Sequence, residues 1–505
     1  MSGQTTTAPS LSIAVRALLR HAVEVYRDSP MTAARLRAQA DRLDEPLRVA
    51  IAGKLKAGKS TLLNALVGEE IAPTDAGECT RVVTWYRDAA SPRVTLLPRQ
   101  GGPRQLPLTR TDGRLEFDLQ GCPAEDVDRL LVDWPSRSLQ VTTLIDTPGI
   151  GSLSTHVSAR TIALLAPEDQ PSDADAVVYL IRHLHATDVR FLEAFHDQRG
   201  TPAAVINTIA VLSRADEIGA GRLDAMVSAR HIARRYRAEP KLRRLCQTVV
   251  AVAGLLAQTA RTLRHGEFTA LRELAGLSRV ELDTLLLSAD RFCHPEAHPT
   301  LPAQVRTALI ERFGLFGLRL ATTLIRQGHR EPTTLAAELV RRSGLDELRT
   351  VLTTQFTERS EVLKARSALL LIQRTLREEP RPGGEALAGE LERILAGAHE
   401  FRELRLLAEL RAPDVALPPE VRLDAERLLG GHGAAAAHRL GLSPTDELAQ
   451  LREAAIAALN RWRRRAENPL TDRASSDQAR VVVRSCEGIL ARLTPGPESH
   501  IQPIP

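Results

Sequence analysis

Several features that would assign this chain to a familiar protein class are scarce or missing. No run approaches the roughly 20 apolar residues that a membrane-spanning helix needs, and the N-terminus lacks the apolar core of a signal peptide. The few cysteines lie far apart, without CxxC or histidine spacing, which argues against a disulfide framework or a zinc site. The sequence therefore predicts a cytoplasmic protein with free thiols at Cys79, Cys122, Cys246, Cys293 and Cys486.

Aromatic residues are also rare, at 3% of the chain, so the core must be built mainly from Leu, Val and Ala. A length of 505 residues exceeds what one hydrophobic core supports and predicts two or three domains. The net charge of +5 is spread over this length, and no segment resembles a nucleic-acid-binding module. We therefore expect no nucleic-acid partner.

Lysine is the scarcest charged residue, with five against 62 arginines, and three of the five fall within residues 53–60. That segment reads GKLKAGKS and matches a phosphate-binding loop, or P-loop. An apolar run at 47–52 precedes it and predicts a buried parallel strand, and residues 61–66 after it predict a helix. Strand, loop and helix form the context that this motif requires.

In a P-loop the glycines let successive backbone N–H groups turn toward an anion, and the helix N-terminus adds partial positive charge. We expect Lys59 to reach the β- and γ-phosphates of a nucleotide and Ser60 to hold Mg²⁺. The alternative, a glycine turn without a ligand, is disfavoured because lysine is so rare in this chain. Further contacts to the nucleotide are expected from Gly53, Lys56, Ala57, Gly58 and Thr61.

Short apolar runs alternate with helix-like stretches up to about residue 258, which predicts an α/β domain with a mostly parallel sheet and helices on both faces. Beyond residue 260, helical spacing broken by proline and glycine predicts an all-α bundle. The expected strands are 47–52, 81–86, 93–97, 130–133, 142–145, 176–181, 204–212 and 248–252. The expected parts are a disordered start (1–10), N-terminal helices packing with the neck (11–46), the α/β domain (47–260), a helical neck and stalk (261–494) and a disordered tail (495–505).

A metal-binding acid is expected at the end of another strand, and the segment Asp146-Thr147-Pro148-Gly149 supplies one. Asp146 is expected to hold Mg²⁺ through water, and the Gly149 N–H to sense the γ-phosphate. A polar stretch at 73–80 offers a threonine that reaches Mg²⁺ only when a γ-phosphate is bound. We select Thr80 over Thr74, against the alternative of an ordinary surface threonine.

The base is expected to bind after two later strands. Asp216 follows an apolar strand, and its two oxygens suit the ring N–H and exocyclic amine of guanine, a donor pair that adenine lacks. Ser213 and Arg214 depart from the usual Asn/Thr-Lys-x-Asp signature, although Arg214 can still cover the base plane. Ala253 and Gly254 follow the strand at 248–252 and are expected to supply a further backbone N–H.

Together the P-loop, Thr80, DTPG at 146–149 and SRAD at 213–216 resemble the dynamin-like large GTPases, and most closely their actinobacterial branch. The likeness is densest over 47–260 and weaker after 380. It implies a GTPase that uses Mg²⁺ and GTP, assembles on membrane lipids at the inner face of the cell membrane, and pairs with itself or a paralogous dynamin-like protein. Nucleotide-driven pairing of GTPase domains would then remodel or cut membranes.

Two positions bear on how water is activated. Small GTPases have a glutamine after Asp-x-x-Gly, but this chain has Ile150, and dynamins resemble it in lacking that glutamine. At the position of Lys56, related families carry an arginine finger, or a serine that binds a monovalent cation. We hypothesise that the Lys56 ammonium replaces that cation or finger; the alternative is a solvated loop lysine.

Membrane contact has two candidate segments. Residues 313–325 form an apolar stretch that suits either a lipid-inserting tip or, preferably, a buried helix under the α/β domain. Residues 461–465 are rich in arginine and suit anionic headgroups or, preferably, a solvated helix face. The functions left open are a membrane-remodelling GTPase and a GTP-regulated scaffold with a paralogous partner; Asp216 disfavours a P-loop ATPase.

Overall fold

The computed structural model describes residues 11–73, 81–111, 113–149, 173–197, 207–298, 300–411 and 417–493. The chain forms two compact units, each considered by itself below. The larger unit takes Pro46–Arg199 and Thr208–Thr350. The smaller takes Met1–Glu45, Gly200–Asn207 and Val351–Pro505.

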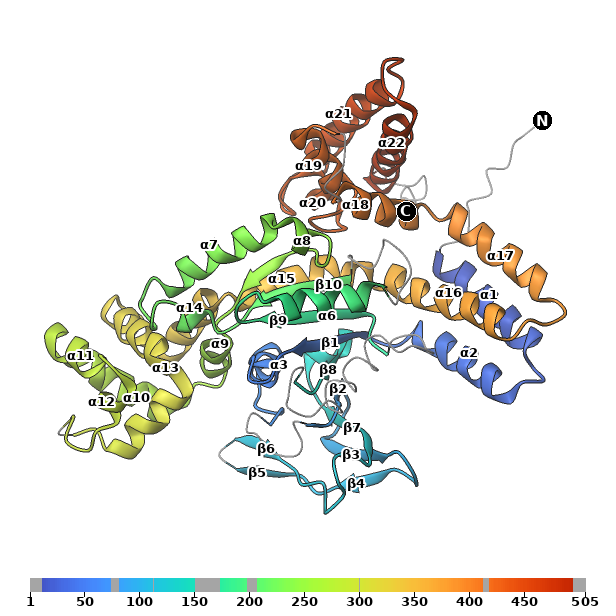
Figure 1. The fold of residues 1–505 in the computed structure, drawn as a ribbon. Helices are drawn as coiled ribbons and strands as arrows, with labels where there is room; N and C mark the ends of the chain where they lie inside the picture. The colour runs from blue at the N-terminus through green and yellow to red at the C-terminus, as the bar shows by residue number, and fades with distance from the viewer. Residues whose placement is uncertain are drawn as a thin grey trace, which may run out of the picture. The chain divides into compact units, whose positions relative to one another are not determined.

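A nine-stranded, mostly parallel sheet organises the larger unit, in the order β11-β10-β9-β1-β8-β2-β7-β3-β4 (Figure 1). From β11 to β8 all neighbours are parallel, whereas β2 runs antiparallel to β8, and β3 runs antiparallel to β7 and β4. The strands are β1 (Leu47–Gly53), β2 (Thr84–Asp88), β3 (Arg93–Pro98), β4 (Arg104–Leu106), β7 (Val127–Trp134), β8 (Thr142–Asp146), β9 (Ala176–Ile181), β10 (Thr208–Leu212) and β11 (Val249–Ala251); β5 (Thr109–Thr111) and β6 (Arg114–Glu116) form a separate hairpin.

The predicted fold class is confirmed. Every expected strand is present with small shifts of its ends, the largest among the described residues being starts at Thr84 for β2 and at Val127 for β7. Residues 204–206 of the strand expected at 204–212 lie outside the described residues, and β10 begins at Thr208. The short strands β4, β5 and β6 were not predicted, because three residues are too few to show a recognisable alternation of polar and apolar side chains. All residues of β9 and β10 are buried. Because successive side chains of a strand point to opposite faces, both faces of the central sheet are covered.

Helices of the second half of the sequence belong to this same unit. The core that contains β9 and β10 continues into α10 and α13, so the predicted domain boundary at residue 260 falls inside the larger unit. The spacing of apolar residues shows which face of a helix is buried, but not which other element of the protein covers that face. The helices of this unit are α3 (Lys59–Val67), α4 (Arg137–Val141), α6 (Ala186–Asp197), α7 (Ala225–Ala238), α8 (Pro240–Arg243), α9 (Gly254–Arg261), α10 (His265–Gly276), α11 (Arg279–Leu285), α12 (Ala289–Cys293), α13 (Ala303–Arg326), α14 (Pro332–Ser343) and the first part of α15 (Leu345–Gln355).

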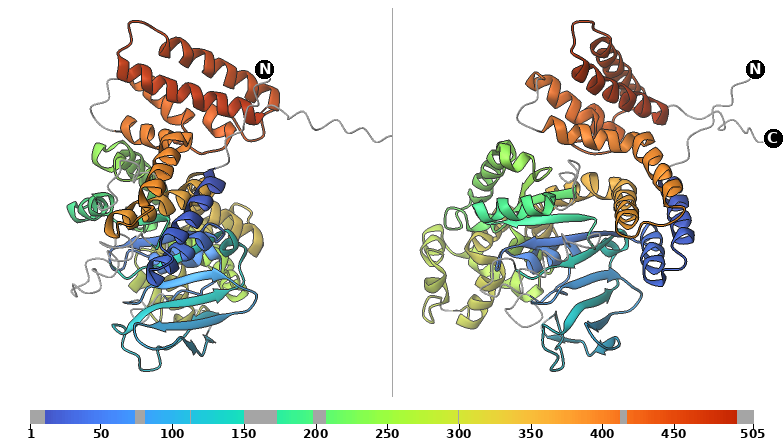
Figure 2. Two further views of the ribbon diagram at one scale, coloured as in Figure 1. Left: turned by 90° about the vertical axis from the view of Figure 1, so that its right-hand side faces the viewer. Right: turned by 45° about the vertical axis from the view of Figure 1, so that its right-hand side comes forward.

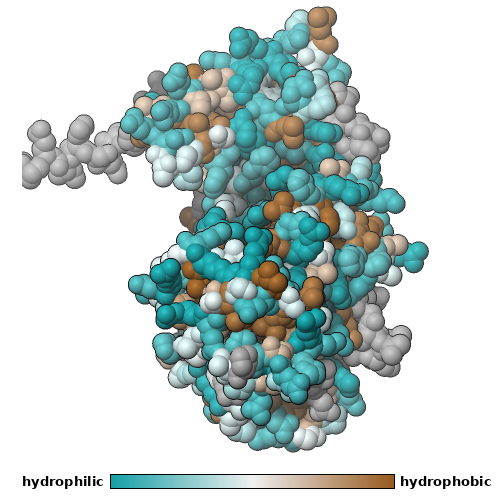
Figure 3. Space-filling view, turned by 90° about the vertical axis from the view of Figure 1, so that its left-hand side faces the viewer, coloured by the Kyte–Doolittle hydropathy of each residue, from teal (hydrophilic) through white to brown (hydrophobic). Residues whose placement is uncertain are grey.

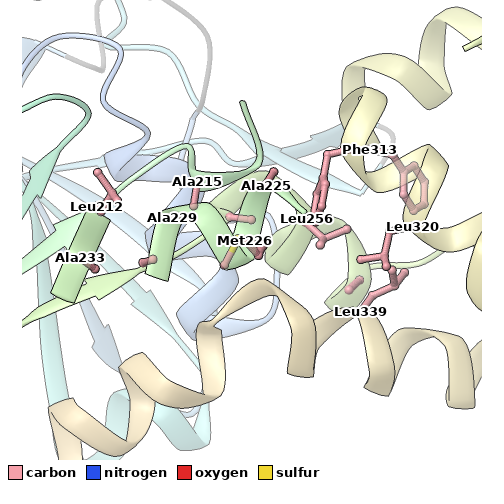
Figure 4. Packing of buried hydrophobic residues seen from close by; sticks show 14 of the residues in the cluster. Leu212, Ala215, Ala225, Met226, Ala229, Ala233, Leu256, Phe313, Leu320 and Leu339 are labelled. Carbon is pink, nitrogen blue, oxygen red and sulfur yellow. The ribbon is translucent and has the colours of Figure 1, made fainter. Parts of the chain in front are cut away.

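The apolar stretch 313–325 lies within α13 and is core. Phe313, Leu320 and Leu324 are at most 4% exposed, and Figure 4 shows Phe313 and Leu320 in the same core as Leu256 and Leu339. On the face of the molecule in Figure 3, hydrophobic residues are interspersed among hydrophilic ones. Of the two interpretations of this stretch, the buried helix is therefore correct, and a lipid-inserting tip here is not.

The described residues of the smaller unit form helices and their connections, without a strand. In it α1 packs against α2, α16 and α17 (Figures 1 and 2). Leu18, Tyr26 and Ile372 are among the residues buried between these helices. A second core joins α18–α22. In the described part of the chain, no helix has both the length and the apolar character to cross a bilayer. The helices are α1 (Leu11–Val25), α2 (Pro30–Arg42), the end of α15, α16 (Ser360–Glu378), α17 (Gly384–Gly397), α18 (His399–Leu410), α19 (Pro419–Leu428), α20 (Ala436–Leu440), α21 (Leu448–Ala466) and α22 (Arg473–Leu493).

Candidate functional site

The P-loop joins β1 to α3 and has the backbone geometry that its glycines predict. Gly58 precedes α3 with φ +90°, a left-handed conformation that favours glycine. Gly53 has φ +151°, and a Cβ there would lie 2.8 Å from the carbonyl oxygen of Leu180 in β9. The loop therefore starts tightly against β9, where a side chain would be excluded.

Lys59 and Ser60 open α3 and point toward the end of β8. Lys59 is 9% exposed, and its Nζ lies 3.4 Å from the backbone oxygen of Lys54. Burial lowers the pKa of Lys59, while the nearby Asp146 acts in the opposite direction. The Ser60 hydroxyl donates to Oδ2 of Asp146 at 2.6 Å. A lysine and a hydroxyl–carboxylate pair therefore stand together at the start of one helix.

Asp146 reaches this place because β1 and β8 run parallel, with Ile51 paired to Asp146, so both strands end at one edge of the sheet. Burial raises the pKa of Asp146, and Lys59 and Ser60 oppose that shift. Its Oδ1 is buried and has no hydrogen-bond partner among the described residues. An unsatisfied carboxylate oxygen beside a serine hydroxyl is a donor set that fits Mg²⁺, which prefers hard oxygen ligands.

Further metal ligands are few. Across the described ranges, no cluster of three or more His, Cys, Asp or Glu side chains could hold a metal ion. A cation at Ser60 and Asp146 therefore depends on oxygens from water or a bound phosphate, as is usual for Mg²⁺ at nucleotide sites. The third predicted ligand, Thr80, lies outside the described residues. So do Thr74, which was rejected as that ligand, and Ile150, which follows the Asp-x-x-Gly segment.

The Asp-x-x-Gly segment closes one side of the P-loop. A Cβ on Gly149 would lie 2.8 Å from Cα of Leu55, so only glycine permits this approach. Thr147 ties the segment to β1 through hydrogen bonds from its hydroxyl (2.9 Å) and its N–H (3.3 Å) to the Ile51 oxygen. The Gly149 backbone thus stands against the loop in which a terminal phosphate would lie.

A pocket extends from the P-loop to the ends of β10 and β11, and it unites segments that lie far apart in the sequence. Most of the predicted nucleotide contacts on this side line it, together with Glu217 and apolar residues that were not predicted. The lining comprises Ala57, Gly58, Thr61, Leu62, Leu180, Val211, Ser213, Arg214, Asp216, Glu217, Val252, Gly254 and Leu255.

Asp216 is the acid of this pocket. It lies in the 3₁₀ turn Ala215–Glu217 after β10 and is 8% exposed. Burial raises its pKa to about 6, an effect to which Glu217 adds and which Arg214 opposes. A carboxylate that is costly to ionise without a partner suits a ligand that brings two hydrogen-bond donors.

Arg214 adopts a left-handed conformation, with φ +51°. Its guanidinium donates to Glu217 at 2.6 Å, and Arg182 donates to the other oxygen of Glu217 at 2.6 Å. Glu217, which was not predicted, thus fixes the Arg214 head at the pocket. The three-residue spacing from Arg214 to Glu217 is a signal that could have revealed this pair.

The backbone donor expected after β11 differs from the prediction in detail. The Ala253 N–H donates to the Ser343 oxygen at 2.9 Å, and Ala253 does not line the pocket. Gly254 does line it and is the first residue of α9, whose first N–H groups have no intrahelical acceptor. The available donor is therefore the N–H of Gly254, because the N–H of Ala253 already donates to the Ser343 oxygen at the end of α14.

Lys56 is the remaining predicted contact. It is exposed and has φ +59°, a conformation that few residues other than glycine adopt. Within the part of the chain that the structure describes, its side chain forms no hydrogen bond or ion pair of its own. Its ammonium is therefore available to a ligand, and its catalytic role stays a prediction.

Comparison with known proteins adds an independent finding. Residues 49–105 match the model of the Dynamin family. The chain is 46% identical over 492 residues to the isoniazid-induced protein IniC of Mycobacterium tuberculosis, covering 96% of this chain and 99% of IniC. It is 34% identical over 142 residues to IniA of the same organism, covering 27% of this chain and 22% of IniA. A solved structure of an oligomerised bacterial dynamin pair aligns with 97% of this chain and 81% of its own, at 14% identity and a TM-score of 0.32.

Proposed function

The chain belongs to the dynamin family of GTPases, as an IniC-like bacterial member, and from this premise we propose that it binds and hydrolyses GTP with Mg²⁺ and couples pairing of its GTPase domains to membrane remodelling. The observation that carries the GTPase part is the convergence of Lys59, Ser60 and Asp146 at the sheet edge that also bears Asp216. Phosphate, metal and base sites then lie along one edge, as one nucleotide requires.

In this proposal the triphosphate lies over the N-terminus of α3, where backbone N–H groups from Gly58 to Thr61 receive it. The ammonium of Lys59, which lies near the Lys54 oxygen in the free protein, would then contact the β- and γ-phosphates instead. Ser60 and, through water, Asp146 hold Mg²⁺, with Thr80 as the predicted third ligand; the ion supplies charge neutralisation when bound. Asp216 accepts from the guanine N1–H and amine, beside Ser213, Arg214 and the Gly254 N–H.

For Lys56 we propose that its exposed ammonium stabilises charge that develops between the β- and γ-phosphates. Because it would replace a monovalent cation or an arginine finger, Lys56→Ala is expected to lower kcat about a hundredfold and to make turnover depend on added potassium. Steady-state phosphate release with and without potassium measures both effects. A variant with wild-type turnover in the absence of potassium would remove the proposal.

The alternative function is a GTP-regulated scaffold that pairs with a paralogous dynamin-like protein without cutting membranes. Two observations support it. The apolar stretch of α13 is core, and the arginine-rich end of α21 is partly neutralised, since Arg461 pairs with Asp424 at 3.0 Å and Arg463 pairs with Glu487 at 2.7 Å. The α13 segment is thus not a free apolar surface, and ion pairs reduce the positive charge of the α21 segment.

One experiment separates the two functions. GTP turnover is measured against protein concentration, with and without liposomes containing anionic lipid. For a remodelling GTPase we expect the specific rate to rise with concentration, to rise about tenfold further on liposomes, and the liposomes to become tubulated or divided. Concentration dependence without any liposome effect would support the scaffold and contradict membrane remodelling. No turnover and no GTP binding would contradict both.

A further inference from the structure

A buried carboxylate outside the P-loop holds one of the loop's lysines. Asp188 lies in the first turn of α6 and is 1% exposed. Its Oδ2 accepts from Nζ of Lys54 at 3.0 Å and from the backbone N–H of His185 at 3.0 Å. Its Oδ1 accepts from the hydroxyl of Tyr179 at 3.0 Å. Both oxygens are thus engaged by donors from three separate elements.

The position of Asp188 is fixed by rigid elements. Tyr179 belongs to β9, and its ring stacks on Phe191 of α6 with centroids 5.2 Å apart. Burial and the adjacent Asp188 raise the pKa of the Tyr179 hydroxyl, which therefore remains a donor. A carboxylate this deep is costly without a cation. Lys54 supplies that cation from a side chain that is 37% exposed, so the pair is open to solvent on the lysine side.

Lys54 also contacts the lysine expected to bind phosphate, because its backbone oxygen lies 3.4 Å from Nζ of Lys59. The residue before it, Gly53, is held against β9, whereas Leu55 and Lys56 after it are exposed. Lys54 is therefore the anchored residue next to the exposed part of the loop, and its backbone oxygen also accepts from the Ala57 N–H at 3.1 Å. The P-loop motif leaves this position open to any residue, so the motif does not explain the contact.

We propose that Lys54 and Asp188 form a positioning pair, which holds the first turn of the P-loop in its phosphate-receiving conformation and so places Lys59. The inference rests on the proposed GTP binding. Asp188 acts through Lys54, and neither residue needs to touch the nucleotide. Without the pair, the loop must be ordered when the nucleotide binds, and that cost lowers affinity.

The test is Lys54→Met, which keeps the length of the side chain and removes its charge. We expect the Kd for GTP and the KM to rise about tenfold, as loss of a hydrogen bond to a charged group implies, with kcat less than about threefold changed. Lys54→Arg should retain most of the affinity, since a guanidinium also pairs with a carboxylate. Lys241→Met is the matched control, because Lys241 is exposed on α8 and forms no hydrogen bond or ion pair within the described ranges.

The double variant with Asp188→Asn distinguishes positioning from general stability. If the two residues act as a pair, Lys54→Met adds little in an Asp188→Asn background. Hydrogen exchange of the 53–58 amides without nucleotide should increase in Lys54→Met. Lys54→Met also leaves Asp188 buried without a cation and should lower thermal stability, whereas the double variant carries no buried charge and should regain part of that stability. Wild-type GTP affinity and exchange in Lys54→Met would overturn the inference while the proposed function stands. Failure of the wild-type protein to bind GTP would overturn the proposed function and this inference with it.

Discussion

Replacement of Lys59 by alanine is expected to lower the rate of GTP hydrolysis about a thousandfold. Lys59 is 9% exposed, and among the described residues its ammonium lies near the backbone oxygen of Lys54 and the carboxylate of Asp146. Its removal leaves charge that develops on the phosphates without a cation in a site where water screens poorly. Phosphate release at saturating GTP and Mg²⁺ measures the loss, and direct nucleotide titration separates binding from turnover.

The matched control for this change is Lys241→Ala, which removes an exposed lysine of the same unit and should leave turnover unchanged. Lys59→Arg is expected to be slow as well, because the planar guanidinium of arginine does not fit the space that the compact ammonium of lysine occupies. Unchanged folding is checked by thermal unfolding of each variant. If Lys59→Ala retained more than about a tenth of the wild-type rate, the P-loop would not be the catalytic centre.

The parts of the site that could be predicted are those encoded by neighbouring residues. The P-loop fixes its own backbone, since Gly58 supplies the left-handed turn that opens α3. Asp146 and Asp216 follow apolar strands, and parallel strands end at one edge, so their approach to the loop follows from topology alone. The strands themselves were recognisable as continuous apolar runs, which is typical of strands buried on both faces.

The parts that could not be predicted depend on pairs of residues distant in the sequence. Lys54 and Asp188 are 134 positions apart, and nothing local to either residue indicates the other. The N–H of Ala253 donates to the backbone oxygen of Ser343, so that the N–H of Gly254 is the one available to the pocket. The end of the sheet-containing unit could not be predicted for the same reason. The spacing of apolar residues in α13 defines a face that must be buried, but it does not indicate that this face packs in the core of the sheet.

Asp216→Asn is expected to exchange the base preference from guanine to xanthine. Guanine offers an N1–H and an amine, both donors, to the two oxygens of Asp216. Asparagine presents one acceptor and one donor, which match the N1–H and the C2 carbonyl of xanthine. GTP affinity should therefore fall about a thousandfold and XTP affinity rise above it, because a buried donor facing a donor is left unpaired. Competition between GTP and XTP for a fluorescent nucleotide measures the exchange, and Asp224→Asn, an exposed aspartate outside the pocket, is the matched control.

The same carboxylate gives GTP binding a pH dependence with a definite sign. Burial raises the pKa of Asp216 to about 6 in the free site, so the ionised form that accepts both guanine donors is lost as pH falls below this value. Between pH 7 and pH 5, GTP affinity should drop about tenfold through this group. Asp146, whose pKa is also raised by burial, titrates in the same direction. Because Asp146 can only add to this loss, a GTP affinity that stays constant between pH 7 and pH 5 would contradict the role of Asp216 as the residue that binds the base.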